Sequence, residues 1–319
     1  MAAPTDPRDT ARAHDDARAR DAARSHDEVD PQDGTDPRDD LGLPVPLGPH
    51  PPRRVVSLVP SLTEAVAATA PGLLVGATDW CSHPADLAVT RIGGTKNPDL
   101  PGILALGPDL VIANDEENRR PDLDSLRAAG VPVWVTDIRT LDDGLRSLHR
   151  LLTVACQLPR PAWLDEAEAA WRDLPPGPGR GPTDGTIEGP TNEPADEPAD
   201  GPRVIVPIWR RPWMVLGRDT FAGDLLHRLG LRLVHARHPD RYPAVPLPEL
   251  LAEQPDLVVL PDEPYRFTAE DGPEAFPGIP AALVSGRHLT WYGPSLATAP
   301  AVLRPAIDHP FVQGRESTP

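Results

Sequence analysis

Leu100-Pro-Gly-Ile-Leu-Ala-Leu-Gly-Pro-Asp-Leu-Val-Ile-Ala-Asn-Asp-Glu-Glu117 and Leu247-Pro-Glu-Leu-Leu-Ala-Glu-Gln-Pro-Asp-Leu-Val-Val-Leu-Pro-Asp-Glu-Pro264 are two similar stretches of one chain. Ten of their eighteen columns are identical. A repeat of this length indicates that one helix-then-strand unit is built twice, and two widely spaced copies do not make a solenoid. The repeat therefore predicts two similar lobes with a cleft between them, a favoured place for a small-molecule site.

The residues around the first copy predict an alternation of strands and helices. Short apolar runs, typical of buried strands, lie at 55–59, 73–76, 110–113 and 131–135. Helices are expected at 122–129, closed by Gly130, and at 141–156, where Leu141, Leu145, Leu148 and Leu152 fall on one face. Ser61 with Glu64 three residues later matches a capping box, so we interpret Glu64 as a helix cap and not as a catalytic acid.

The second copy is surrounded in the same way. Strands are expected at 204–206, 257–260 and 282–284, and Thr220 is placed to cap a helix that Gly230 ends. Strands that alternate with helices favour parallel sheets covered on both faces, so the predicted fold class is α/β. Between the lobes, residues 159–174 have Pro161 at a first helical turn, early acids and no interior breaker, which predicts a connecting helix.

Composition sets the domain boundaries. Residues 1–52 and 175–202 are rich in Pro, Asp and other polar residues and have no apolar period. Such segments bury too little to offset chain entropy, so we expect a disordered acidic tail and a disordered linker. The predicted lobes are then residues 53–158 and 203–310, followed by a tail at 311–319.

Charge and cysteine content exclude several classes of protein. The net charge is −17, much of it on the two polar segments, and no basic stripe is present that would bind nucleic acid. Cys81 and Cys156 make neither a disulfide framework nor a zinc motif. No apolar run is long enough to span a membrane. No export signal or lipid-anchor cysteine is visible, so a cytoplasmic protein is expected as written, or an extracytoplasmic one if the start codon is misassigned.

Several motifs together resemble the helical-backbone (class III) solute-binding proteins of ABC importers, which include cobalamin, ferric-siderophore and haem receptors. The resemblance covers about residues 53–308 and rests on Arg54-Val-Val-Ser-Leu-Val-Pro-Ser-Leu-Thr-Glu64, Leu74-Val-Gly-Ala-Thr-Asp-Trp-Cys-Ser-His-Pro84, Ile103 to Ala113, Leu126-Arg-Ala-Ala-Gly-Val-Pro-Val133 and Leu250 to Val259. It implies two Rossmann-like lobes with parallel sheets, a single connecting helix, small hinge motion and a ligand in the cleft.

The resemblance also implies a monomeric receptor that needs no cofactor of its own and delivers its ligand to a permease. The cobalamin-binding branch is the most similar. The family docks onto its permease through an acidic residue on each lobe, and this sequence has Pro101 and Pro248 there, with Glu249 beside the second. An aromatic expected after the strand at 110–113 is Asn114 instead.

Tryptophan is unusually frequent, with seven Trp against four Phe, and its indole N–H makes it a poor choice for a dry core. We therefore expect indoles to stack on a flat ligand, with an arginine pairing with its acidic groups. The candidate ligand-binding residues are Trp80, Trp209, Arg210, Trp213, Tyr242 and Trp291. Of these, Trp80, Tyr242 and Trp291 also match aromatic positions of the family. His83 and Cys81 are weaker candidates as axial metal ligands. His235 and His238 make a poor zinc pair because no carboxylates accompany them.

Three functions remain open at this point. The first is non-catalytic binding of a corrinoid or another metal macrocycle or chelate. The second is a two-lobed enzyme of tetrapyrrole metabolism such as a metal chelatase, for which His83 with Glu116 or Glu117 would supply base and ligand. Only fold analogy supports that enzyme. The third is a scaffold with a degenerate cleft. No nucleotide-binding loop or nucleophile elbow is present, and we expect no catalytic residue.

Overall fold

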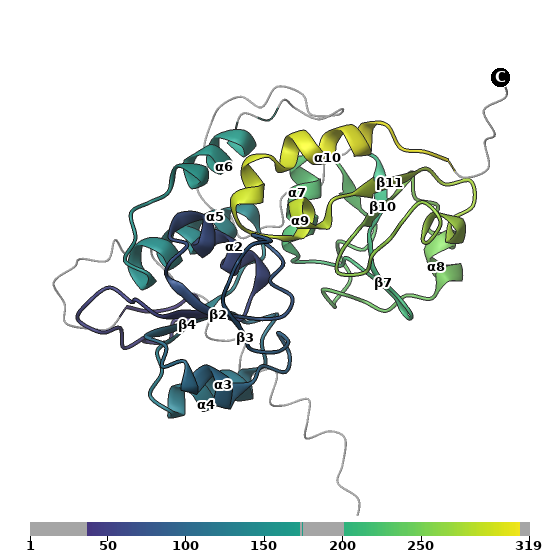
Figure 1. Cartoon of the computed structure of the whole chain (residues 1–319). Coiled ribbons are helices and arrows are strands. Elements are labelled where there is room, and N and C mark those ends of the chain that lie inside the picture. Colours follow the sequence, from purple (N-terminus) through teal and green to yellow (C-terminus); the bar gives the residue numbers. More distant parts are fainter. Residues whose placement is uncertain (1–36, 173, 175–200, 313–319) are drawn as a thin grey trace, which may run out of the picture. The chain divides into compact units, whose positions relative to one another are not determined.

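A computed structural model describes residues 37–172, 174 and 201–312 (Figure 1). In this part of the chain, two parallel sheets have the strand orders β3-β2-β1-β4-β5 and β11-β10-β6-β9, and β7 pairs with β8 in a separate antiparallel hairpin. The strands are β1 Val55–Ser57, β2 Leu74–Ala77, β3 Thr90–Arg91, β4 Leu110–Asn114, β5 Val133–Thr136, β6 Arg203–Ile205, β7 Pro207–Arg210, β8 Trp213–Val215, β9 Arg232–Leu233, β10 Leu257–Pro261 and β11 Ala281–Val284. The predicted α/β class with parallel sheets is confirmed.

The repeated stretch occupies the same place in both sheets. Helix α3 (Leu100–Ala105) leads into β4, which pairs with β1 and β5, and helix α8 (Leu247–Ala252) leads into β10, which pairs with β6 and β11. Even the register agrees, because Leu110 pairs with Val55 and Leu257 pairs with Val204. The helix-then-strand unit predicted from the repeat is therefore present twice.

The Pro-Asp columns of the repeat have a structural reason. Asp109 Oδ2 accepts hydrogen bonds from the backbone N–H groups of Arg53 (2.8 Å) and Arg54 (3.0 Å). Asp256 Oδ2 accepts the equivalent bond from the N–H of Arg203 at 2.7 Å. In each lobe this aspartate ties the start of the repeated strand to the start of the central strand. An N–H at a strand end would otherwise lack a ladder partner, so the repeat keeps the residue that satisfies it.

Helices cover the sheets as the alternation requires. In Figure 1, α3 and α4 lie on one side of the first sheet, and α2 and α5 lie on the other. The remaining helical elements are α2 Pro60–Thr69, α4 Arg120–Ala128, α5 Leu141–Arg150, the π-turn η2 Leu151–Ala155, α6 Ala162–Arg172, α7 Phe221–Arg228, η3 Pro273–Ala275, α9 Gly286–Thr290, η4 Pro294–Ala297 and α10 Ala299–Asp308. The helix predicted at 141–156 is thus α5 continued by a wider π-turn. Gly130 and Gly230 follow α4 and α7 with positive φ, as a helix end favours.

The predicted capping box at Ser61 and Glu64 is wrong. Helix α2 begins at Pro60, its N-cap residue is Val59, and no side chain caps it. Proline already has the φ angle of a first helical residue and lacks the N–H that a cap would satisfy, so the helix starts before Ser61. Glu64 is consequently one turn inside the helix, with its carboxylate free for another partner.

The first lobe begins earlier than predicted. Composition predicts that residues 37–52 belong to a disordered tail, but Val45 is 1 % exposed and belongs to the core of the first lobe. Asp40 accepts hydrogen bonds from Ser147 and Arg150 of α5, so a partly buried carboxylate holds this segment against the helix. Composition missed it because a few apolar contacts around Val45 and the ion pairs of Asp39 and Asp40 do not make a periodic pattern. Residues 1–36 lie outside the described residues.

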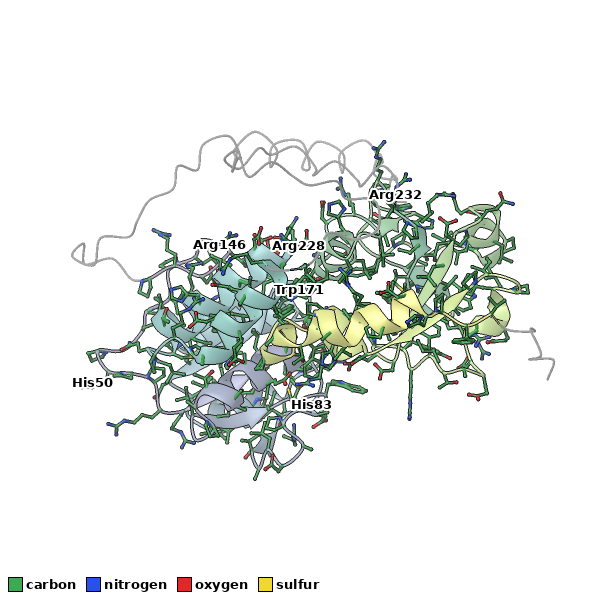
Figure 2. The ribbon with its side chains drawn as sticks, turned by 90° about the horizontal axis from the view of Figure 1, so that it is seen from above. His50, His83, Arg146, Trp171, Arg228 and Arg232 are labelled. Atoms are coloured by element: carbon green, nitrogen blue, oxygen red, sulfur yellow. The ribbon has the colours of Figure 1, made fainter. Side chains whose placement is uncertain are left out.

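The connecting helix is present as α6, two to three residues shorter at each end than predicted. Leu164, Ala167 and Trp171 (labelled in Figure 2) are its buried residues. The indole N–H of Trp171 donates to Leu296 O at 3.0 Å. Most of the predicted linker, residues 175–200, lies outside the described residues, as do residues 313–319 of the predicted tail. The described end of the tail is part of the fold, because Phe311 pairs with Ala281 at the start of β11.

One hydrophobic core extends through both lobes. The larger buried cluster includes strands β1 and β4 of the first lobe and Phe221, Leu225 and Leu296 of the second. A smaller cluster lies wholly within the second lobe, around Phe267 and Phe276. A shared core resists large separation of the lobes, so movement between them has to be small. Within the described residues, none of the helices is both long and apolar enough to cross a membrane.

Candidate functional site

The carboxyl ends of the strands in the two sheets meet at the junction between the lobes. Open parallel sheets place ligands at this end of their strands. Four pairs of side chains join the lobes there: Glu64 with Arg287, Glu116 with Arg241, Glu117 with Tyr292, and His83 with Trp291. The candidate site is this junction, and its floor is made of ion pairs and aromatic contacts.

Arg287 and Glu64 form the innermost ion pair. Arg287 follows β11 and donates through Nε and Nη2 to both oxygens of the Glu64 carboxylate, whose side chain is only 8 % exposed. Glu263, which follows β10, is affected by the charges of both Arg287 and Glu64. Burial, with the negative charge of Asp262 as a smaller cause, raises the pKa of Glu263 to about 7, and Arg287 opposes the rise. One arginine therefore balances several carboxyl groups at the junction.

Glu117 and Tyr292 form the second contact. The hydroxyl of Tyr292 donates to Glu117 Oε1 at 3.0 Å. Burial raises the pKa of the Glu117 carboxyl to about 7, with the negative charge of Glu116 as a smaller cause. The buried Tyr292 hydroxyl has a pKa well above its ordinary value for the same reason. A carboxyl group that titrates near neutral pH thus sits between the lobes.

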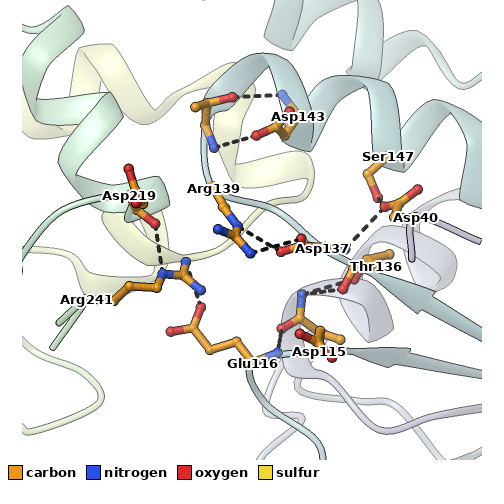
Figure 3. Close-up of polar contacts among 12 residues, drawn as sticks. Asp40, Asp115, Glu116, Thr136, Asp137, Arg139, Asp143, Ser147, Asp219 and Arg241 are labelled. Atoms are coloured by element: carbon orange, nitrogen blue, oxygen red, sulfur yellow. Dashed lines mark hydrogen bonds and ion pairs between the residues drawn. The ribbon is translucent and has the colours of Figure 1, made fainter. Parts of the chain in front are cut away.

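Arg241 links the lobes at the third contact (Figure 3). Its guanidinium lies 3.2 Å from Glu116 of the first lobe and donates to the backbone oxygen of Asp219 at 2.8 Å. The adjacent Tyr242 is partly buried, and burial, with Glu116 as a further cause, raises the pKa of its hydroxyl. The first lobe presents a second pair nearby, in which Arg139 donates to Asp137.

Two of the predicted ligand-binding residues are solvent-exposed indoles. Trp80 follows the carboxyl end of β2 and is 68 % exposed. Trp209 lies on β7 of the second lobe, is 43 % exposed, and contacts Tyr265 edge to face at 5.7 Å between ring centroids. Exposed tryptophans at these positions have ring surface available for a partner. Their role in binding stays a prediction.

Trp213 and Arg210 have partners inside the second lobe. The Trp213 ring is stacked on Phe267 at 6.1 Å and lies edge to face with Phe276 at 5.4 Å, which makes it part of the smaller core. Arg210 forms ion pairs with Asp271 and Glu274 and lies over the Trp213 ring. These contacts leave Arg210 already neutralised, so a ligand anion would have to compete with two carboxylates.

The remaining predicted residues surround the junction itself. Trp291 is 7 % exposed and contacts the His83 ring edge to face at 5.4 Å. Cys81 is buried against the hydroxyls of Thr63 (3.0 Å) and Thr78 (3.1 Å), and burial raises the pKa of its thiol. A protonated thiol is a poor metal ligand. Among the described residues, no group of three or more His, Cys, Asp or Glu side chains is arranged to hold a metal ion.

The chelatase pair proposed from sequence has separate partners. His83 contacts Trp291 and Ser82, whereas Glu116 pairs with Arg241 and Glu117 bonds to Tyr292. The positions where the family carries docking acids lie in the first turns of α3 and α8, where Pro101, Pro248 and Glu249 are all exposed.

Sequence reasoning missed the polar floor of the junction. Its signal was nonetheless in the repeat, whose last identical columns are Asp-Glu: Asp115 and Glu116 in the first lobe, Asp262 and Glu263 in the second. Both pairs directly follow the repeated strand, so both lie where the lobes meet. Arg241, which pairs with Glu116, lies outside the repeated stretch, as do Arg287 and Tyr292, which pair with Glu64 and Glu117 at the same junction; none of the three carried a comparable signal.

Comparisons with known proteins agree with this architecture. No family model matches the chain. It is 27 % identical over 220 residues to the Vitamin B12-binding protein of Pectobacterium carotovorum, an alignment that covers 68 % of this chain and 74 % of that protein. It is also 35 % identical over 104 residues to the protein of the same name from Pectobacterium atrosepticum, covering 32 % of this chain and 37 % of the other.

Solved structures show the same fold. The periplasmic Vitamin B12 binding protein BtuF of Vibrio cholerae superposes with a TM-score of 0.57 at 17 % identity, over 82 % of this chain and all of that one. The periplasmic heme-binding protein RhuT from Roseiflexus sp. RS-1 superposes with a TM-score of 0.61 at 21 % identity, over 80 % and 97 %. The two-lobed fold predicted from the sequence motifs is confirmed.

Proposed function

We propose that this chain, a relative of the class III solute-binding proteins, binds a metal macrocycle or metal chelate between its lobes without transforming it. A corrinoid is the first choice, because relatives that match this chain in sequence are named Vitamin B12-binding proteins. Haem or a ferric siderophore is the second, since structures with the same fold include heme-binding proteins. In this proposal the protein needs no cofactor of its own.

One observation carries the proposal. The two exposed tryptophans among the large hydrophobic residues, Trp80 and Trp209, come from different lobes. Trp80 follows the carboxyl end of the parallel strand β2, and Trp209 lies on β7, in the hairpin that follows the parallel strand β6. A flat, bulky ligand would stack on such rings and bury their area, at roughly 25 cal/mol per Å². Leaving indoles exposed has a cost that a binding partner would remove.

The junction between the lobes suits binding more than catalysis. Its ionisable groups are engaged in pairs that join the lobes, such as Glu116 with Arg241. Pairs of this kind can open and close with small hinge movements, and a ligand shifts that equilibrium by contacts made only in one state. The chelatase alternative would instead need a base and a metal ligand converging on one point, and His83 and Glu117 have separate partners.

The partner we propose is an ABC permease, and the place of action is outside the cytoplasm. Solved neighbours of this fold are named periplasmic proteins, so the cytoplasmic expectation is not supported. Docking would use other residues than the family's acids, because Pro101 and Pro248 cannot form ion pairs. Glu249, exposed in the first turn of α8, is the nearest acid on the second lobe. We propose that the receptor is monomeric.

A spectroscopic titration tests the proposal. Cyanocobalamin, hemin and a ferric siderophore are titrated separately into the purified protein, and binding is followed by tryptophan fluorescence and by calorimetry. A corrinoid receptor binds cyanocobalamin with one-to-one stoichiometry, and Trp80→Ala and Trp209→Ala each weaken binding by about tenfold, the equivalent of one lost stacking contact. Absence of saturable binding by all three compounds would refute the proposal.

A matched control separates stacking from general loss of aromatic surface. Phe311 is 36 % exposed but pairs with the first residue of β11, at the opposite end of the second sheet. Phe311→Ala should leave the affinity unchanged. Incubation with free porphyrin and a divalent metal completes the test, because turnover of porphyrin would favour the chelatase instead.

A further inference from the structure

A cavity of about 480 Å³ lies away from the candidate site, where α5, α6 and α7 meet. Figure 2 labels three of its residues, Arg146, Arg228 and Trp171, grouped around these helices and well separated from His83. The volume lies within the range of about 300–1,000 Å³ typical of small-molecule sites. Its floor is apolar, made of Leu141, Leu145 and the ring of Trp171.

Four arginines line this cavity, one from α5 (Arg146), one before α6 (Arg160), one from α6 (Arg172) and one from α7 (Arg228). We propose that the cavity is an anion site for a small molecule that carries phosphate, with the phosphate held by arginines and the organic part against the apolar floor. A guanidinium presents a planar fork of donors that matches phosphate oxygens, which makes arginine the preferred residue for such groups.

The four arginines divide into a fixed pair and an adjustable pair. Arg228 is held by Asp224 and Asp142, both at 2.9 Å, and Arg160 by Asp165 (2.6 Å) and Glu168 (2.5 Å). The side chains of both arginines are 29 % exposed. These carboxylates neutralise the fixed arginines and hold them in place. Arg228 and Arg160 thus form the frame of the cavity, and the other two arginines bind the ligand.

Arg146 and Arg172 are the adjustable pair. Their side chains are 65 % and 69 % exposed, and within the described part of the chain each pairs with a carboxylate on its own helix: Asp143 for Arg146, and Glu168 at 3.9 Å for Arg172. Exposed pairs of this kind contribute about 0–1 kcal/mol, so a multiply charged anion can replace them at little cost. Since the two arginines come from α5 and α6, one phosphate group could engage both.

The position of the cavity also links the lobes. Helix α5 belongs to the first lobe and α7 to the second, and Leu141 N–H donates to Asp224 Oδ2 across the cavity wall at 2.8 Å. A ligand seated here contacts both lobes near the connecting helix. The inference does not depend on what the junction binds, and its test requires no junction ligand.

Inorganic pyrophosphate is the probe for the test, titrated by calorimetry at constant ionic strength into the full chain. The variant that removes the adjustable pair is Arg146→Gln with Arg172→Gln. Its control is Arg119→Gln with Arg120→Gln, which removes the same charge at the start of α4. These two exposed arginines also form surface ion pairs, with Asp122 and Asp115. Thermal melting without ligand checks that each variant is folded, and Arg146→Lys provides a milder change that keeps the charge but loses the fork.

The proposal predicts saturable binding at a single site by the wild type and by the control variant, and binding at least about tenfold weaker in the Arg146/Arg172 variant. Arg146→Lys should fall between them. Two results would overturn it: no saturable binding by the wild type at millimolar pyrophosphate, or equal affinity in the Arg146/Arg172 variant and the wild type.

Discussion

Tyr292 of the second lobe donates a hydrogen bond to Glu117 of the first, with 3.0 Å between the hydroxyl and carboxylate oxygens of residues 175 positions apart. The burial of Glu117 makes the junction between the lobes sensitive to pH, and the bond from Tyr292 opposes part of this effect. Burial raises the pKa of Glu117 from the ordinary 4.5 to about 7, so the folded protein holds this proton where the unfolded chain has lost it.

The first prediction concerns this proton. Because the pKa of Glu117 is raised in the folded state, the contribution of this group to stability is greatest below pH 4.5. That contribution falls as pH rises from about 4.5 to 7. Replacing Glu117 by Gln keeps the bond from Tyr292 and removes the titration. Urea unfolding measures the free energy of unfolding at pH 5 and at pH 8. Its decrease from pH 5 to pH 8 should be smaller in Glu117→Gln than in the wild type, by up to about 3 kcal/mol. Glu166→Gln, an exposed change on α6, should keep the wild-type decrease, and an identical decrease in all three proteins would contradict the assignment.

The second prediction concerns the ion pair between Arg287 and Glu64. Arg287→Met leaves the Glu64 carboxylate, 8 % exposed, without its cation, which should cost about 3–5 kcal/mol of stability. Adding Glu64→Gln removes the uncompensated charge and should restore much of the loss. A double-mutant cycle by chemical denaturation measures the coupling. Additive effects of the two single changes would mean that the pair does not hold the lobes together.

The third prediction concerns the segment that precedes the first strand. Asp40 accepts bonds from Ser147 and Arg150 and has only 11 % of its side chain exposed. Asp40→Ala should lower the free energy of unfolding by about 1–3 kcal/mol, because two donors on α5 lose a charged acceptor. Leu43→Ala, an exposed change on the same segment, should have an effect below about 0.5 kcal/mol. Equal effects of the two changes would indicate that the segment adds no stability.

The fourth prediction separates two tryptophans of the second lobe. Trp213 packs between Phe267 and Phe276, whereas Trp209 is 43 % exposed. Trp213→Ala should destabilise the protein by about 3 kcal/mol through the cavity it leaves. Trp209→Ala should change the melting temperature little and act on ligand affinity instead. Thermal melts of both variants distinguish these roles, and comparable destabilisation by both would place Trp209 in the core as well.

The repeated stretch made the fold predictable. Its Pro-Asp columns, at Asp109 and Asp256, anchor two equivalent strands, and its apolar columns fill the centre of two parallel sheets. These features are local, because a strand's burial and its entry turn are encoded within a few residues of each other. The connecting helix α6 was predictable for the same reason.

The candidate site was less accessible to sequence reasoning. Indoles at the ends of strands could be selected by residue type, and Trp80 and Trp209 are indeed exposed. Trp213 is selected by residue type in the same way. Its neighbours Phe267 and Phe276 lie more than fifty positions away in the chain, and only their packing places its ring in a core. The ordered segment at Asp40 escaped notice because its partners on α5 are about 110 positions distant.

The sequence by itself determined that one α/β unit occurs twice and that acidic pairs follow each copy of its strand, since both properties depend on short-range pattern. Only the tertiary structure decided that Glu116 meets Arg241 of the other lobe, and which side chains share the cavity between α5, α6 and α7. Such contacts depend on the relative placement of segments far apart in the chain. That placement results from packing over the whole core and leaves no mark in any single stretch of residues.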